Sequence, residues 1–178
     1  MKWGIIGRGD IAEKVMSHAM RNSDEDELFA VMRRDPILAE ELGRKHGASK
    51  IYTNLEDLLN DESIDAVYVA TPVYLHKEQT IMAANYGKHV LCEKPMAIGS
   101  GPAQAMIDAC EENNVKLVIS HQRRFTPGWE KAKQLVDDGL IGNPLFIELK
   151  ALEGLLNWAT HNIDGSRYIV GDPETEWV

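Results

Sequence analysis

Short strand-like segments alternate with helix-like segments along almost the whole chain, and this alternation restricts the fold more than any other feature. The strand-like segments are brief apolar runs, and the helix-like segments carry apolar residues at three- and four-residue spacing. The predicted strands are Lys2–Ile6, Leu28–Met32, Lys50–Tyr52, Ala66–Ala70, His89–Cys92, Lys116–Ser120 and Leu145–Leu149. The predicted helices are Asp10–Arg21, Ile37–His46, Leu55–Leu59, Tyr74–Tyr86, Pro102–Glu112, Gly128–Asp138 and Asn157–Val170. Strands joined through helices form right-handed βαβ units, so the sequence predicts the α/β class, with a doubly wound parallel sheet covered on both faces.

A glycine-containing turn joins the first predicted strand to the first predicted helix. It matches a dinucleotide-binding fingerprint with alanine at the third glycine position, and it reads Gly7-Arg8-Gly9-Asp10-Ile11-Ala12. Gly7 permits the tight turn, Gly9 allows a pyrophosphate to approach the backbone, and the small Ala12 allows the helix to pack closely on the strand. Glycine turns open many helices, so the motif by itself is weak evidence. Its place at the start of a βαβ pattern favours a Rossmann-type dinucleotide-binding domain over a plain turn.

The end of the second predicted strand bears on which dinucleotide binds. A site that prefers NAD usually has an acidic residue there, which binds the adenosine ribose. This chain has Arg33 and Arg34 followed by Asp35, and two guanidinium groups can pair with a 2′-phosphate. The alternative is that both arginines are solvated surface charges and that Asp35 binds the ribose. We expect NADP, with NAD as the alternative.

Charge and apolar patterning narrow the classes of partner. The chain of 178 residues has a net charge of -9 and is 44% apolar, which argues for a globular protein and against broad binding of nucleic acid or of an anionic membrane surface. No apolar run approaches the ~20 residues of a membrane span, and the N-terminus has no signal-peptide pattern. The two cysteines, Cys92 and Cys110, have no metal-ligand spacing. A cytoplasmic location is therefore the expectation.

Several further motifs, taken in order, resemble those of the Gfo/Idh/MocA family of oxidoreductases. Besides the glycine turn, these motifs are Val69-Ala70-Thr71-Pro72 with His76, Gly87-Lys88-His89-Val90-Leu91-Cys92-Glu93-Lys94-Pro95-Met96-Ala97, His121-Gln122-Arg123-Arg124-Phe125-Thr126-Pro127 and Gly139-Leu140-Ile141-Gly142-Asn143-Pro144. The Glu-Lys-Pro motif is quite specific, and the resemblance extends from residue 2 to the end of the chain. It implies an NAD(P)-dependent oxidoreductase that exchanges a hydride between the nicotinamide and a secondary alcohol of a sugar, cyclitol or related polyol.

The resemblance gives Lys94 a catalytic role next to the nicotinamide, where it reaches the substrate hydroxyl. Ligands of parallel sheets bind at the carboxyl ends of the strands, and Lys94 directly follows such an end. A positive charge there can stabilise a developing alkoxide and help to orient the reacting carbon. Pro95 fixes the backbone, and the resemblance implies a cis Lys94–Pro95 bond. The alternative is a surface lysine in a turn.

The same resemblance places further residues along the cofactor. Those outside the glycine turn and the second strand are Ala70, Thr71, Pro72, His76, Glu93, Lys94 and Gln122. Thr71 and Pro72 belong to a loop over the nicotinamide ribose and the pyrophosphate, in which Thr71 is expected to cap the next helix. His76 is expected to pack and to form hydrogen bonds rather than to act as an acid or base.

A polar stripe near the end of the chain is the second candidate for catalysis. Asn157, His161 and Asp164 share one face of a predicted helix because they lie four and three residues apart. By spacing alone such a stripe is typical of solvated surface, whereas the resemblance makes His161 the catalytic histidine. Asn157 stands where many family members have aspartate, and an amide can bind a substrate but cannot act as a base. Arg123 and Arg124 are either substrate contacts or parts of buttressing salt bridges.

The sequence divides into two predicted domains. Residues 1–122 form the Rossmann domain, and residues 123–178 form a connecting helix and the start of an α+β substrate or oligomerisation domain. The resemblance implies a larger antiparallel sheet than these residues can form. The alternatives to an active enzyme are therefore a non-catalytic dinucleotide-binding module or remnant with little turnover, and a chain completed by a partner. Because an unpaired strand edge attracts another strand, we expect the apolar segment Leu145–Leu149 to form homo-oligomer contacts. The alternatives are that it packs back on the first domain, or that the chain is disordered beyond about residue 150.

Overall fold

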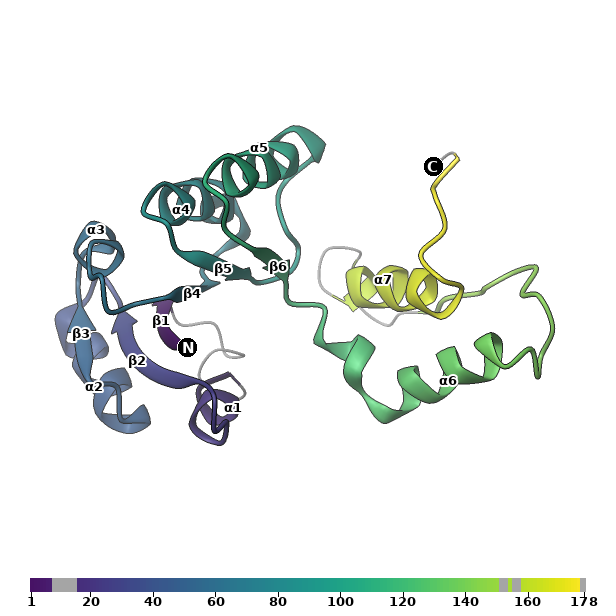
Figure 1. The fold of residues 1–178 in the computed structure, drawn as a ribbon, viewed down its shortest axis with the longest axis horizontal. Helices are drawn as coiled ribbons and strands as arrows, with labels where there is room; N and C mark the ends of the chain where they lie inside the picture. The colour runs from purple at the N-terminus through teal and green to yellow at the C-terminus, as the bar shows by residue number, and fades with distance from the viewer. Residues whose placement is uncertain (8–15, 151–153, 155–157, 177–178) are drawn as a thin grey trace. The chain divides into compact units, whose positions relative to one another are not determined.

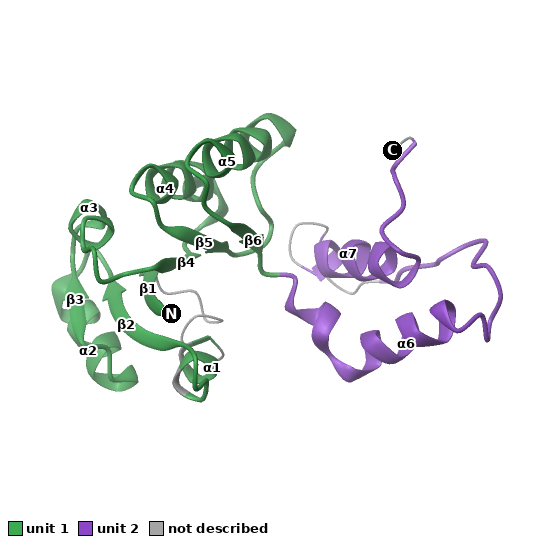
Figure 2. Ribbon diagram, viewed as in Figure 1, with its two compact units in different colours: residues 1–120 green, residues 121–178 purple. Residues whose placement is uncertain are grey.

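The computed structural model describes residues 1–7, 16–150, 154 and 158–176 (Figure 1). These residues form two compact units, Met1–Ser120 and His121–Val178, which Figure 2 colours separately. The predicted site residues outside the described ranges are Arg8, Gly9, Asp10, Ile11 and Asn157. Half of the predicted helix Asp10–Arg21, residues 10–15, also lies outside them.

The first unit is built on a parallel sheet of six strands in the order β3-β2-β1-β4-β5-β6. The strands are β1 Lys2–Gly7, β2 Glu27–Met32, β3 Lys50–Tyr52, β4 Ala66–Ala70, β5 His89–Cys92 and β6 Leu117–Ile119. The chain runs outward from β1 to β3, returns to β4 on the other side of β1, and runs outward again to β6. Neighbouring strands are parallel, which confirms the predicted doubly wound sheet and places the reversal of strand order between β1 and β4.

Helices connect these strands, and α2 begins and ends at residues that favour helix termini. The described helices of the first unit are α1 Ser17–Arg21, α2 Pro36–His46, α3 Leu55–Leu59, α4 Val73–Asn85 and α5 Ser100–Glu112. Asp35 caps α2, because its Oδ1 accepts a hydrogen bond from the backbone N of Leu38 at 3.1 Å. Gly47 ends the same helix with a φ of 72°, a conformation that glycine adopts without steric cost. Helices α4 and α5 pack against each other over β5 and β6 (Figure 1).

Both faces of the sheet are buried, and consecutive residues of one strand enter different cores. Ile6 lies in one core with Val67 and Val69, whereas Ile5 lies in the other with Tyr68. This alternation is the expected geometry of a strand whose side chains point to opposite faces. Every residue of β4 is buried, so the loop that follows β4 starts from a rigid position at the centre of the sheet.

The regular secondary structure of the second unit, in its described part, consists of helices. It contains a 3₁₀ helix, η2 Gln122–Phe125, followed by α6 Pro127–Asp137 and α7 Thr160–Ile169. Trp129 of α6 packs closely on Gly165 of α7, where a Cβ would lie 2.6 Å from the tryptophan ring. Glycine at position 165 therefore allows the two helices to approach each other.

Leu145–Leu149 is not a strand in the structure, which corrects the sequence-based prediction. The side chains are exposed, with Leu145 at 97% and Phe146 at 82%. A strand satisfies its backbone by pairing with a neighbour, and no strand in the described part of the chain pairs with this segment. The apolar run has the composition of a strand, but the described residues offer it no strand to pair with.

Candidate functional site

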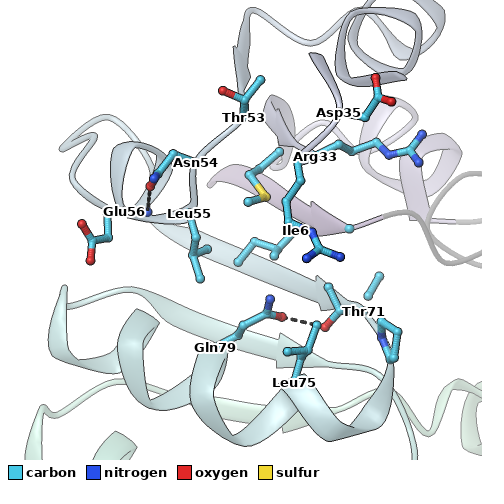
Figure 3. Close-up of a pocket in the computed structure, with 15 residues that line it drawn as sticks. Ile6, Arg33, Asp35, Thr53, Asn54, Leu55, Glu56, Thr71, Leu75 and Gln79 are labelled. Carbon is cyan, nitrogen blue, oxygen red and sulfur yellow. Dashed lines mark hydrogen bonds between the residues drawn. The ribbon is translucent and has the colours of Figure 1, made fainter. Parts of the chain in front are cut away.

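A cavity of about 910 Å³ lies at the carboxyl ends of β1, β2, β3 and β4. It spans the point where the strand order reverses, which is where doubly wound sheets bind their ligands. Figure 3 shows the lining residues, which come from the last residues of β1, β2 and β4, from the loops that follow β2, β3 and β4, and from the first halves of α3 and α4. The lining consists of Ile6, Gly7, Met32, Arg33, Arg34, Asp35, Thr53, Asn54, Leu55, Glu56, Ala70, Thr71, Pro72, Leu75 and Gln79.

Sequence reasoning finds one part of this lining and misses another. The predicted members are Gly7, Arg33, Arg34, Ala70, Thr71 and Pro72. The missed members include Thr53–Glu56, which follow β3, together with Leu75 and Gln79 of α4. The signal that could have found Thr53–Glu56 is topological, because every loop after a parallel strand reaches the same edge of the sheet. Leu75 and Gln79 lie four residues apart and so share one face of α4.

Gly7 brings open backbone to the cavity. Its φ is 94°, a conformation that residues with a side chain rarely adopt. A Cβ at this position would lie 2.7 Å from the carbonyl oxygen of Ala70 and 2.7 Å from Cγ2 of Thr71. The end of β1 thus packs on the end of β4 with no room for a side chain. A bare backbone at this point fits the pyrophosphate of a dinucleotide, which must approach the first turn closely.

Arg33 and Arg34, which follow β2, place two cationic side chains in the lining of the cavity. Asp35 lines the cavity, but its carboxylate is engaged as the cap of α2. Arg33 is held by its backbone N, which donates to the carbonyl oxygen of Tyr52 at 3.0 Å. Within the described ranges, neither Arg33 nor Arg34 has a carboxylate at ion-pair distance. Glu56 contributes one further acidic group to the lining.

Thr71 does not cap α4, which corrects a second expectation. The chain leaves β4 in an extended conformation and the helix begins at Val73, so Pro72 occupies the N-cap position. The hydroxyl of Thr71 instead donates to Oε1 of Gln79 at 2.6 Å (Figure 3). The loop after β4 is therefore fixed to α4 by a side-chain contact along the cavity wall.

His76 is 1% exposed and does not line the cavity. Its Nε2 lies 2.8 Å from the carbonyl oxygen of Thr71, and its Nδ1 lies 3.0 Å from the carbonyl oxygen of Pro95. These contacts agree with the packing and hydrogen-bonding role that the sequence predicts for this residue.

The backbone at Lys94 is fixed by a hydrogen bond to the buried Glu93 side chain. The Lys94–Pro95 bond is cis, as the family resemblance implies. Glu93 is 8% exposed. Its Oε1 accepts a hydrogen bond from the Tyr68 hydroxyl, and its Oε2 accepts one from the backbone N of Lys94 at 3.2 Å. Burial, together with the negative charge of Glu93, raises the pKa of Tyr68, which keeps the tyrosine protonated and able to donate.

In the second unit, the predicted catalytic His161 packs against one other histidine, His121. His161 is 6% exposed, and its ring meets that of His121 edge to face, with centroids 5.9 Å apart. Nδ1 of His121 lies 3.7 Å from Oδ2 of Asp164. Asp164 also accepts hydrogen bonds from Arg124 at 2.6 and 2.8 Å. The predicted polar stripe is thus packed within its unit at His161 and Asp164 rather than solvated.

The two arginines of η2 have structural partners. Arg124 pairs with Asp164 and also with Asp172, at 2.8 Å, and these carboxylates raise its pKa, with the Asp164 hydrogen bond as the largest cause. The Arg123 guanidinium lies 4.1 Å from the centroid of the Trp158 ring, a cation–π distance. Gln122 begins the same 3₁₀ helix. The buttressing alternative therefore applies to Arg124.

Comparison with known proteins decides the family. Residues 1–121 match the model of the GFO_IDH_MocA oxidoreductase family, described as an NAD-binding Rossmann fold. The chain belongs to the Gfo/Idh/MocA oxidoreductase family. Its first unit is the nicotinamide-dinucleotide-binding Rossmann domain of that family. In the part of the chain that the structure describes, no helix has the length and apolar character needed to cross a membrane.

Three relatives illustrate the match. Oxidoreductase P35 of Formosa agariphila is 37% identical over 150 residues, which are 84% of this chain and 47% of that protein. D-xylose 1-dehydrogenase (NADP(+)) 2 of Haloferax volcanii is 38% identical over 136 residues, 76% of this chain and 42% of its own length. The crystal structure of scyllo-inositol dehydrogenase from Lactobacillus casei, with bound NAD(H) and scyllo-inositol, superposes with a TM-score of 0.85 at 25% identity and covers 96% of this chain and 56% of that one. The chain thus spans about half the length of these Gfo/Idh/MocA relatives.

Proposed function

We propose that this chain acts as an oxidoreductase that exchanges a hydride between a nicotinamide cofactor, held in the cavity described above, and a secondary alcohol of a sugar, cyclitol or related polyol. The observation that carries the proposal is the cavity itself, in which bare backbone at Gly7 meets the reversal of strand order. The names of the xylose and scyllo-inositol dehydrogenases support the class of substrate.

We propose NADP as the preferred cofactor. Arg33 and Arg34 would hold a 2′-phosphate, because guanidinium groups pair with phosphate through two parallel hydrogen bonds. Oδ1 of Asp35 is engaged as a helix cap, which leaves its Oδ2 for the ribose hydroxyls. The H. volcanii relative is named for NADP(+), whereas the L. casei structure holds NAD(H). The residues of this chain, rather than the family, therefore argue for NADP.

The bound nicotinamide would supply or accept the hydride. Lys94 would polarise the substrate oxygen and stabilise the negative charge that develops on it. Glu93 supports this role by holding the backbone of Lys94. His161 would take or return the hydroxyl proton as a general acid–base, and Asn157 would hydrogen-bond the substrate.

Cofactor titration followed by a turnover screen tests the proposal. Tryptophan fluorescence should report saturable binding of NADPH and weaker binding of NADH, and a polyol panel should then reveal hydride transfer. Lys94→Ala should leave cofactor affinity nearly unchanged and abolish the transfer, and His161→Asn should also abolish it. If Lys94→Ala destroys cofactor binding instead, Lys94 is a cofactor or structural residue. Failure of the unmodified chain to bind either cofactor would refute the proposed function.

A non-catalytic dinucleotide-binding module is the second candidate. Asn157 favours it, because an amide cannot accept the proton that a carboxylate could. The unmodified chain would then bind NADPH with full affinity and reduce or oxidise no polyol. That result in the same screen selects the module over the enzyme.

A further inference from the structure

We propose that His76 is a positioning residue that ties the cofactor-binding loop after β4 to the Lys94–Pro95 loop after β5. This inference rests on the proposed function, because it assigns His76 to the alignment of the nicotinamide half of the cofactor with Lys94. It assigns no contact between His76 and the cofactor, since the imidazole is buried away from the cavity lining.

The geometry that carries the inference is a bridge between two loops. His76 lies in the first turn of α4, and its two ring nitrogens point to carbonyl oxygens of different loops. One is that of Thr71, at 2.8 Å, and Thr71 lines the cavity. The other is that of Pro95, at 3.0 Å, and Pro95 directly follows Lys94. The loops leave neighbouring parallel strands, β4 and β5, at the same edge of the sheet.

The chemistry of the bridge is unusual for a core histidine. Both partners are carbonyl oxygens, which only accept hydrogen bonds, whereas a neutral imidazole has a single N–H. The neutral ring can donate to one loop at a time, and the imidazolium can donate to both. The neutral ring therefore binds one loop by a hydrogen bond and only packs against the other, whereas the imidazolium binds both; burial keeps water from replacing the ring. An apolar side chain of similar size could fill the same space but could contact neither carbonyl oxygen through a hydrogen bond.

The bridge acts on one half of the site. In a doubly wound sheet the dinucleotide lies across the reversal point, with its two halves over the two halves of the sheet. Arg33 and Arg34 belong to the β1–β3 half, and the loops joined by His76 belong to the β4–β6 half. Loss of the bridge should therefore weaken contacts to the nicotinamide half and leave those to the adenosine half intact.

Two ligands and four variants test this division. NADPH reaches both halves, and adenosine 2′,5′-bisphosphate lacks the nicotinamide, its ribose and the pyrophosphate. His76→Leu removes both ring contacts, His76→Asn can keep the one to Pro95, and His76→Gln can keep the one to Thr71. Thr80→Val is the matched control, because Thr80 is equally buried and lies one turn further along the same helix.

His76→Leu should weaken NADPH binding about fivefold to tenfold, the loss expected for about one net hydrogen bond. Binding of adenosine 2′,5′-bisphosphate should not change. His76→Asn and His76→Gln should each restore part of the NADPH affinity, and Thr80→Val should change neither ligand. Equal weakening of both ligands would mean that His76 only stabilises the fold, and it would overturn the proposal, as would a Thr80→Val variant that behaves like His76→Leu.

A second readout needs no cofactor. Hydrogen exchange of the peptide that contains Lys94 should speed up about fivefold to tenfold in His76→Leu, as for the loss of about one net hydrogen bond, and remain slow in His76→Asn, which keeps the Pro95 contact. Unchanged exchange at Lys94 in His76→Leu would overturn the bridge. If the unmodified chain bound neither ligand, the proposed function would fail, and this exchange measurement would still decide whether His76 holds the Lys94 loop.

Discussion

Replacement of Gly7 by alanine offers a direct test of how the glycine turn works, because the chain contains a matched control. Gly7 and Gly99 have nearly the same φ, 94° and 98°. A Cβ on Gly7 would lie 2.7 Å from both Ala70 and Thr71 atoms, whereas a Cβ on Gly99 would have no heavy atom within 4 Å. The pair of variants Gly7→Ala and Gly99→Ala thus separates backbone strain from crowding between β1 and β4.

The magnitudes follow from these two terms. An alanine at such a φ costs about 1–3 kcal/mol, and this cost applies to both variants. Overpacking against a rigid neighbour adds about 1–3 kcal/mol, and this applies only at Gly7, whose closest contact is backbone. We expect Gly7→Ala to lose about 2–6 kcal/mol of unfolding free energy and Gly99→Ala about 1–3 kcal/mol.

Urea unfolding monitored by circular dichroism measures both losses, and NADPH titration measures the effect on the site. Gly7→Ala should also weaken NADPH binding about tenfold or more, equivalent to about 1.4 kcal/mol, because separation of β1 from β4 would move the backbone at which we propose that the pyrophosphate binds. Gly99→Ala should bind NADPH normally. Equal losses of stability in the two variants, or normal binding by Gly7→Ala, would refute the packing argument.

Three further predictions concern charge, pH and association. Arg34→Ala should remove most of the preference for NADPH over NADH, about 1.5–3 kcal/mol for a charge-assisted contact. Arg44 is exposed, and the control variant Arg44→Ala should keep the preference. Equal affinity of the unmodified chain for both cofactors would contradict the reasoning. Burial and the hydrogen bond to Asp61 raise the pKa of Tyr52 from 10.0 to about 12. Because the folded-state pKa is the higher one, this stabilisation is complete below pH 10 and disappears as the pH rises through about 12. Tyr52→Phe should therefore make the unfolding free energy fall less steeply with pH in that range. Part of the fall should remain, because burial also raises the pKa of Cys92 to about 12. An unchanged slope of unfolding free energy against pH would show that Tyr52 does not contribute. Phe146→Ser should reduce concentration-dependent association in sedimentation velocity if the exposed Leu145–Leu149 segment mediates it, and an unmodified chain that stays monomeric at high concentration would exclude that role.

Local sequence determined most of the sheet and its helices. The strands β1 to β6 appear at the predicted places, with ends that differ by one residue or less, because each is an apolar run between turn residues and needs only its parallel neighbours. Gly47 ends α2 and Asn54 begins α3, and both caps depend only on residues within one turn. The cis Lys94–Pro95 bond, which the family resemblance of the Glu-Lys-Pro motif implied, is present as well.

Tertiary structure decided which partner each polar group found. Glu93 meets Tyr68 across 25 residues of sequence, and Arg124 meets Asp164 across 40, so no local pattern could assign either pair.

Leu145–Leu149 shows the same limit for the backbone, because its sequence suits a strand and its surroundings contain no described partner. Propensity and periodicity act between near neighbours, whereas hydrogen bonds between distant segments depend on where the whole chain brings them.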